Sequence, residues 1–226
     1  MASRTRTRRV AAALIALVAV AGGSLAGAAR KPLTEEELLA GIQAWLDGTR
    51  TLQGGFEQQL VSGALGSGME ESGRLYIGRP GRMRWDYIDP ERKVALVDGE
   101  LTWLWVEEEG QMMLGRLGEQ GELLPRLLAG EGRLADSFDV SVASYPSRPA
   151  KGEYLVELVP KGGDEAFEHV VLQVRPPDFA IEAAEVLDAA GNRILYRFHD
   201  LRRNRPITDE QFRFEPPEGT LILGKH

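Results

Sequence analysis

The chain has 226 residues, of which 34 are acidic and 27 are basic, and it contains no cysteine. The protein therefore has no disulfide bonds, no thiol nucleophile and no cysteine on which a bacterial lipoprotein could carry its acyl anchor. A formal net charge of −7 argues against binding to nucleic acid or to anionic lipid surfaces.

Residues 1–28 have the pattern of an export signal. A basic region is followed by a short apolar segment and a small-x-small sequence, at Arg4 to Arg9, 10–21 and Ala26-Gly27-Ala28. Twelve apolar residues are few for a membrane span, so an uncleaved anchor is the less favoured alternative. We expect cleavage near Ala28, export to the periplasm by the Sec or the twin-arginine route, and one mature domain over residues 29–226.

The mature segment begins with a predicted helix over residues 32–48. Thr34 and Glu37 have the spacing of a capping box, and large apolar residues recur at helical spacing from Leu38 to Leu46. A strand is predicted to start near Thr51. The glycine-rich loop over 63–68 lacks the order of a phosphate-binding loop and precedes no helix, so we interpret it as a connection to a strand at Gly73.

Residues 73–105 are predicted to form four antiparallel strands. The turns are Arg79-Pro80-Gly81, Asp89-Pro90 and Asp98-Gly99. In the second strand apolar and charged residues alternate from Arg82 to Tyr87, which is typical of a strand with one buried face. Residues 101–106 are apolar on both faces, so we expect this strand to be covered on both sides.

The rest of the chain adds more strands and two short helices. Strands are predicted over 111–116, 138–143, 154–159, 167–175, 181–187 and 194–201, and helices over 121–130 and 133–137. The helices are too few to alternate with about eleven strands, which excludes a parallel α/β sheet. The predicted fold class is mainly β (α+β), with one curved antiparallel sheet that forms an incomplete barrel and has helices over its concave face.

The sequence offers little for catalysis or metal binding. It has no G-x-S-x-G elbow and no H-E-x-x-H pair. His169 and His199 fall on different predicted strands, and His226 is the last residue, so we interpret all three as structural or incidental. We expect no enzymatic activity, no cofactor and no metal, although a pair of carboxylates that the fold brings together stays open.

Short motifs follow one another in a characteristic order over about residues 38–220. They are Leu46-Asp47 before Leu52, Phe56-x-Gln58, Arg79-Pro80-Gly81-x-x-x-Trp85, Pro90, Asp98-Gly99-x-x-x-Trp103 and Phe212-x-Phe214-x-Pro216-Pro217-x-Gly219. In this order they resemble the LolA family, the periplasmic carriers of outer-membrane lipoproteins. The chain departs from the family at residues 106–109, where Val-Glu-Glu-Glu replaces an aromatic-x-Pro turn.

The resemblance implies a half-barrel closed by a helical lid, which binds the acyl chains of lipoproteins in a hydrophobic cavity and shuttles them from the inner to the outer membrane. It implies that Arg79 hydrogen-bonds into the lid and keeps the empty cavity shut. It also places Leu46 in the lid, and Met83 and Trp85 on the concave face. The implied partners are an inner-membrane ABC complex that releases lipoproteins and an outer-membrane receptor, with the carrier a monomer.

A carrier of acyl chains needs an apolar concave lining. A chain of about fourteen methylenes has a transfer free energy of roughly 11 kcal/mol, which a polar surface cannot supply. The residues predicted to bind lipid are Leu46, Leu52, Phe56, Leu75, Met83, Trp85 and Trp103. Two other functions stay open: a related lipid sensor or carrier of another lipid, and an enzyme that acts on lipid.

Overall fold

The computed structural model describes residues 32–64, 66, 68–116, 127–128, 132–143, 152–162 and 167–224. They belong, apart from Pro32, to one unit, Leu33–His226. The predicted signal peptide and most of the predicted helix over 121–130 lie outside the described residues. In the described part of the chain, no helix has both the length and the apolar character needed to cross a membrane.

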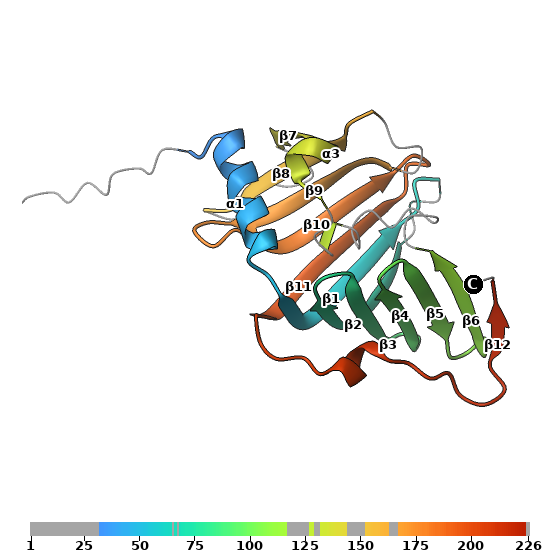
Figure 1. Ribbon diagram of the computed structural model, residues 1–226. Helices are drawn as coiled ribbons and strands as arrows, with labels where there is room; N and C mark the ends of the chain where they lie inside the picture. Colours follow the sequence, from blue (N-terminus) through green and yellow to red (C-terminus); the bar gives the residue numbers. More distant parts are fainter. Residues whose placement is uncertain are drawn as a thin grey trace, which may run out of the picture. The chain divides into compact units, whose positions relative to one another are not determined.

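Twelve strands form one sheet in the order β12-β6-β5-β4-β3-β2-β1-β11-β10-β9-β8-β7. Their bounds are β1 Thr51–Val61, β2 Gly68–Gly78, β3 Arg82–Asp89, β4 Lys93–Asp98, β5 Leu101–Val106, β6 Gln111–Arg116, β7 Phe138–Val142, β8 Tyr154–Pro160, β9 Phe167–Arg175, β10 Ala180–Asp188, β11 Arg193–Arg203 and β12 Leu221–Leu223. Neighbouring strands are antiparallel except β12, which runs parallel to β6. The sheet is curved and does not close, since β7 and β12 end the order (Figure 1). The predicted fold class is confirmed.

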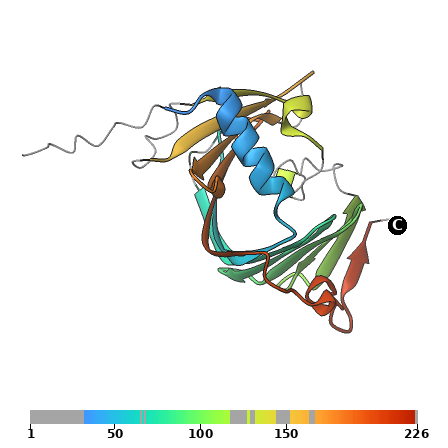
Figure 2. The ribbon, with the colours of Figure 1, turned by 60° about the vertical axis from the view of Figure 1, so that its left-hand side comes forward.

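One long helix lies inside the bend of the sheet. It is α1, Glu35–Asp47, and Figure 2 shows it on the concave side. The capping box is confirmed: the Thr34 hydroxyl accepts a bond from the Glu37 amide at 3.2 Å, and the Thr34 amide donates to the Glu37 carboxylate at 2.8 Å. The apolar stripe of α1 is buried against the sheet. The helix is therefore stabilised by this packing as well as by its N-terminal cap.

The described residues include two further short helical turns. The first is α3, Leu134–Ser137, as predicted, and the second is the 3-10 turn η1, Asp209–Phe212. The side chain of Gln43 in α1 accepts a hydrogen bond from the Leu134 amide at 2.8 Å, which ties α3 to α1.

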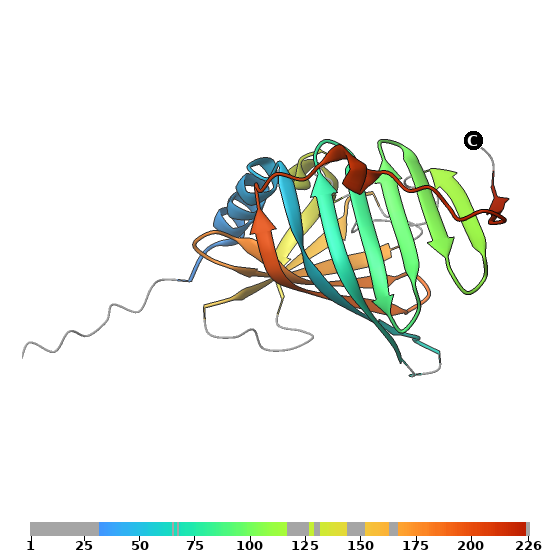
Figure 3. The ribbon, with the colours of Figure 1, turned by 90° about the horizontal axis from the view of Figure 1, so that it is seen from below.

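The C-terminal segment crosses the convex face of the sheet (Figure 3). Phe212 packs over Gly78, where an added Cβ would come within 2.8 Å of its ring, and Phe214 packs on Trp105 with ring centroids 5.2 Å apart. Leu104 and Val106 occupy the other face of the same strand. We expected β5 to be covered on both sides. On the convex side this segment covers it at Trp105.

Two strand predictions were wrong in detail. Strand β2 begins at Gly68 and not at Gly73, because Met69 to Ser72 pair with β1 although this segment shows no apolar alternation. Strand β12 was not predicted. Its three residues are all exposed and pair only with β6, so they carry no burial pattern that sequence reasoning could detect.

Candidate functional site

The concave face of the sheet is apolar along most of its length. Paired residues on neighbouring antiparallel strands point to the same side, so the register decides which residues share this face. It places Leu75 opposite Trp85, and Ile77 opposite Met83, on the side where α1 lies. We call α1, α3 and the buried pair Leu127 and Leu128 the lid, because they cover this face.

Six of the seven residues predicted to bind lipid come together here. They are at most 5% exposed and belong to one hydrophobic cluster with the lid: Leu46, Leu52, Phe56, Leu75, Met83 and Trp85. Leu46 comes from the lid and the other five from β1, β2 and β3. In this closed arrangement the lid leucines and the sheet bury one another.

Trp103 is the seventh predicted residue, and it does not belong to this buried cluster. It pairs with Leu96 on one side and Leu114 on the other, whereas Ala95, the partner of Trp85, pairs with Leu104. Alternation therefore turns the Trp103 side chain to the convex face. Leu104 takes the concave position that the prediction gave to Trp103.

Aromatic rings form the floor of the concave face around Phe56. Its ring meets Trp85 and Tyr87 edge-on, with centroids 4.7 and 5.0 Å away, and Trp85 also contacts Tyr196 at 5.5 Å. Such edge-to-face pairs add roughly 0.5–1.5 kcal/mol each beyond the area they bury. Sequence reasoning missed Tyr196, which comes from the distant strand β11.

Arg79 joins the end of β2 to the lid. Its guanidinium donates to the carbonyl of Leu46 in α1 and, at 2.7 Å, to the carbonyl of Leu128. The Nε hydrogen is buried and has no partner among the described residues. Burial lowers the pKa of Arg79, an effect that the nearby Asp47 carboxylate opposes and Arg203 reinforces. One side chain thus holds two separate parts of the lid.

Arg203 is a second cation at the same end of α1, and sequence reasoning missed it. Its Nε donates to the Thr49 hydroxyl at 2.8 Å, and its guanidinium lies 5.7 Å from the centre of the Trp45 ring. Cations near a helix C-terminus are stabilised by the unpaired carbonyls there. Since Arg203 belongs to β11, 154 positions from Thr49, no local pattern could have shown the contact.

A hollow of about 200 Å³ remains open on the concave face beside the aromatic floor. The concave side chains around it come from five strands: Trp85, Tyr87, Ala95, Val97, Thr102, Leu104, Met113 and Tyr196. Leu96, Trp103 and Leu114 also border it, from strand positions whose side chains face the convex side. Pockets for small molecules usually measure about 300–1,000 Å³. This hollow by itself is too small for a whole acyl chain.

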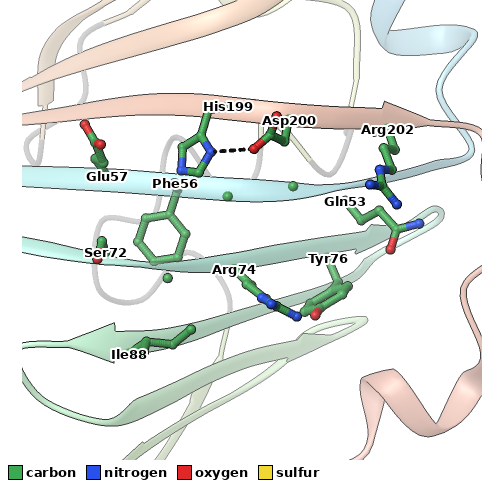
Figure 4. Close-up of a pocket in the computed structure, with 13 residues that line it drawn as sticks. Gln53, Phe56, Glu57, Ser72, Arg74, Tyr76, Ile88, His199, Asp200 and Arg202 are labelled. Carbon is green, nitrogen blue, oxygen red and sulfur yellow. Dashed lines mark hydrogen bonds and ion pairs between the residues drawn. The ribbon is translucent and has the colours of Figure 1, made fainter.

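A larger groove of about 610 Å³ lies on the convex face (Figure 4). It forms where Gly54, Gly55 and Gly73 leave the backbone uncovered, and the His199 ring occupies the space over Gly55. His199 Nδ1 lies 3.2 Å from the Asp200 carboxylate. Four charged side chains, Glu57, Arg74, Asp200 and Arg202, also line the groove. A hydrocarbon chain bound there would take these charges out of water, so the groove does not suit one.

Within the described residues no group of three or more histidines, cysteines and carboxylates could hold a metal ion. His169 lies 3.8 Å from Glu157, on a strand separate from that of His199. The two histidines that the structure describes are thus not brought together.

Comparison with known proteins identifies the family. Residues 47–215 match the model of the outer membrane lipoprotein carrier protein LolA. The chain belongs to the LolA family. It is 31% identical to an outer-membrane lipoprotein carrier protein of Dechloromonas aromatica over 81% of this chain and 86% of that protein. It is 29% identical to one of Ralstonia nicotianae over 95% of each chain.

A solved structure supports the fold. The crystal structure of an uncharacterized conserved protein from Thermus thermophilus has a TM-score of 0.52 and 13% identity, over 83% of this chain and 97% of that one. At this identity the similarity concerns the fold alone. The LolA motifs of this chain, by contrast, can be placed on the structure: Arg79 directly follows β2, Trp85 lies on the concave face, and Phe212 and Phe214 lie on the convex face.

Proposed function

We propose that this LolA-family protein is a periplasmic carrier that binds the acyl chains of lipoproteins on its concave face and shuttles them from the inner to the outer membrane. The observation that carries the proposal is the position of Arg79. Its bonds to Leu46 and Leu128 fasten a helical cover over an apolar surface that would be costly to expose empty. The relatives described above are named as lipoprotein carriers, which supports the same cargo.

A shuttle must open to take up cargo and close again after releasing it, and the free energies of the Arg79 bonds and of acyl-chain burial allow both. Each hydrogen bond from the Arg79 cation to a lid carbonyl contributes roughly 1.5–3 kcal/mol. An acyl chain of about fourteen methylenes gains roughly 11 kcal/mol on leaving water. Cargo that takes over the lid's apolar contacts with the sheet can therefore offset the loss of the two bonds, and the two bonds favour reclosure after the cargo leaves.

The proposed acyl-binding residues are the five of the sheet, Leu52, Phe56, Leu75, Met83 and Trp85, together with Leu46 of the lid. Arg79 is the proposed lock. Leu104 and Met113, whose side chains face the hollow, join this set, whereas Trp103 borders the hollow from a position whose side chain faces the convex side. The lid would move away from these residues and the acyl chain would take its place against them.

The route of the cargo follows from the proposal. Residues 1–28 would direct export and be removed near Ala28. A lipoprotein-releasing ABC complex of the inner membrane would load the monomeric carrier, and a receptor at the outer membrane would unload it. No bond of the cargo needs to be broken, so the carrier acts as a binding protein and not as an enzyme.

Native mass spectrometry of the mature protein tests the proposal. The protein is co-expressed with a triacylated lipoprotein or, as the control, with the same lipoprotein in which the acylated cysteine is replaced by serine. We expect a complex with the acylated cargo only. Binding of free phospholipid in place of the cargo, or no binding at all, would contradict the carrier proposal and favour a lipid sensor or another ligand.

A further inference from the structure

A row of hydrogen-bonded polar side chains interrupts the apolar concave face. Lys93 is paired with the Glu71 carboxylate, which accepts a hydrogen bond from the Gln58 amide at 3.2 Å. The side-chain oxygen of Gln58 accepts a hydrogen bond from the Tyr87 hydroxyl at 3.0 Å. The ammonium of Lys93 also lies 4.7 Å from the centre of the Tyr87 ring. We call Gln58, Glu71, Tyr87 and Lys93 the polar cluster.

The register shows that the cluster faces the cavity and not the outside. Gln58 is directly opposite Glu71, and Tyr87 is directly opposite Lys93, on the same face as Phe56 and Trp85. Four neighbouring strands, β1 to β4, each contribute one member. The arrangement is therefore a feature of the folded sheet and is not produced by any local sequence motif.

The ion pair in this cluster is withdrawn from water. Glu71 is only 8% exposed, and the Lys93 side chain is 18% exposed. Such a pair loses much of its hydration, and an apolar pair of the same shape is often as stable or more so. Stability alone thus gives no reason for a carboxylate and an ammonium at this position among aromatic rings.

The cluster adjoins the hollow on the concave face. Tyr87 belongs to both, and Tyr196, which also lines the hollow, lies directly across from Gln58. The Tyr196 hydroxyl has no hydrogen-bond partner in the described part of the chain. Glu71 stands eight positions before Arg79 along β2, so the cluster lies roughly 26 Å from the lock at about 3.3 Å per residue.

We propose that the polar cluster and Tyr196 bind the carbonyl linkage that joins an acyl chain to the rest of the cargo. This inference rests on the proposed function. Hydrocarbon can slide along an apolar floor without a fixed position, whereas an ester or amide withdrawn from water must find hydrogen-bond partners. Lys93 and Tyr196 can donate to a carbonyl oxygen, and Glu71 can accept from an amide N–H. The contact would fix how deeply the chain enters.

Three single-chain lipids with the same hydrocarbon separate the possible linkages. They are a monoacylglycerol with an ester, an N-acylethanolamine with an amide, and an alkylglycerol with an ether and no carbonyl. Affinities are measured for the mature protein below the critical micelle concentration. We expect the ester, the amide or both to bind about tenfold more tightly than the ether, which corresponds to about 1.4 kcal/mol. An ester preference identifies the glyceryl linkage, and an amide preference identifies the N-acyl linkage.

The double variant Glu71→Gln with Lys93→Met removes both charges together, so that no unpaired charge stays buried. We expect this variant to bind all three lipids with the affinity that the wild type has for the ether lipid. The control is Arg84→Met with Asp86→Asn, which removes a partly buried ion pair of β3 from the convex face, with nitrogen and oxygen 2.7 Å apart. It should keep the tenfold preference. Thermal unfolding of both variants checks that they are folded.

The outcomes distinguish this inference from the proposed function. Equal binding of the three lipids by the wild type would overturn the inference and leave the carrier proposal intact. A carbonyl preference that persists in the Glu71/Lys93 variant would also overturn it. Failure of all three lipids to bind would contradict both, because no acyl chain would then enter the cavity.

Discussion

Thr49 stands between Trp45 and Arg203, and its hydroxyl connects them. It donates to the Trp45 carbonyl at 2.6 Å and accepts from Arg203 Nε at 2.8 Å. The C-terminus of α1 is thereby bound to β11 independently of Arg79. Two arginines, Arg79 and Arg203, thus hold the same end of α1.

Thr49→Val is expected to destabilise the protein. The methyl group fills the space of the hydroxyl but forms neither hydrogen bond, so the buried Trp45 carbonyl and Arg203 Nε both lose their partner. We expect the free energy of unfolding to fall by about 1–3 kcal/mol, as measured by chemical denaturation. Thr220→Val is the control, since Thr220 makes one exposed bond to Pro217, and it should cost less. Equal effects of the two variants would show that the contact with Arg203 adds nothing.

Arg79→Leu is expected to slow the release of cargo. Without the bonds from Arg79 to Leu46 and Leu128, the closed empty state is destabilised by roughly 1.5–3 kcal/mol per bond. Because release of cargo returns the carrier to this state, the equilibrium for release becomes at least about tenfold less favourable. Transfer of a labelled lipoprotein to acceptor membranes measures the effect. Arg82→Leu removes an exposed arginine paired with Asp209 and serves as control. Transfer by Arg79→Leu at the wild-type rate would rule out the lock.

Trp85→Leu and Trp103→Leu form a matched pair on opposite faces of the sheet. Trp85 lies on the aromatic floor, so its replacement should weaken binding of a fluorescent fatty-acyl probe, by about tenfold for the loss of 1–2 kcal/mol of apolar contact. Trp103 faces the other side, and its replacement should leave the affinity within about twofold. A similar loss of affinity in both variants would contradict the assignment of faces.

Asp188 gives a test by pH. Burial opposes its ionisation, but hydrogen bonds from the side chain and amide of Asn192 and from the Ala190 and Gly191 amides together lower its pKa below the ordinary value of 3.8. A carboxyl group with a lowered folded-state pKa stabilises the protein fully above its unfolded pKa, and the effect is lost as the pH falls through the folded value. Asp188→Asn should therefore be less stable than the wild type at pH 7.

The stability difference between Asp188→Asn and the wild type should shrink below about pH 4, when the wild-type carboxyl also becomes neutral. Denaturant unfolding at several pH values follows it. A difference that does not change between pH 7 and pH 2 would mean that the charge of Asp188 plays no part in the turn between β10 and β11.

The sequence predicts local structure well where one face is polar. Strand β3 alternates charged and apolar residues, so its buried face, with Met83 and Trp85, was assigned correctly. Strand β5 is apolar on both faces, and hydrophobicity alone could not assign Trp103. The information was nevertheless present: in the two-residue hairpin after Asp98 the register pairs Leu96 with Trp103, and counting from that turn would have placed Trp103 away from Trp85.

Contacts between distant segments were beyond sequence reasoning. Arg79 was assigned only through the family resemblance, since an arginine beside a turn is ordinarily exposed. Arg203 and the polar cluster had no signal at all. Glu71 looks like one more surface carboxylate of a polar segment, and it becomes unusual only when β1, β3 and β4 bring Gln58, Tyr87 and Lys93 to it.

The convex-face segment that carries Phe212 and Phe214 also constrains the order of folding. Strand β6 gains its second neighbour, β12, from more than a hundred positions later in the chain, and Trp105 is covered by a residue almost as distant. Contacts of such long sequence separation form late, because a large loop must close first. Until they form, the β5–β6 end of the sheet is an unpaired apolar edge, the kind of surface on which newly made chains aggregate. A carrier that shields the acyl chains of lipoproteins from water would itself need to be shielded from aggregation while it folds.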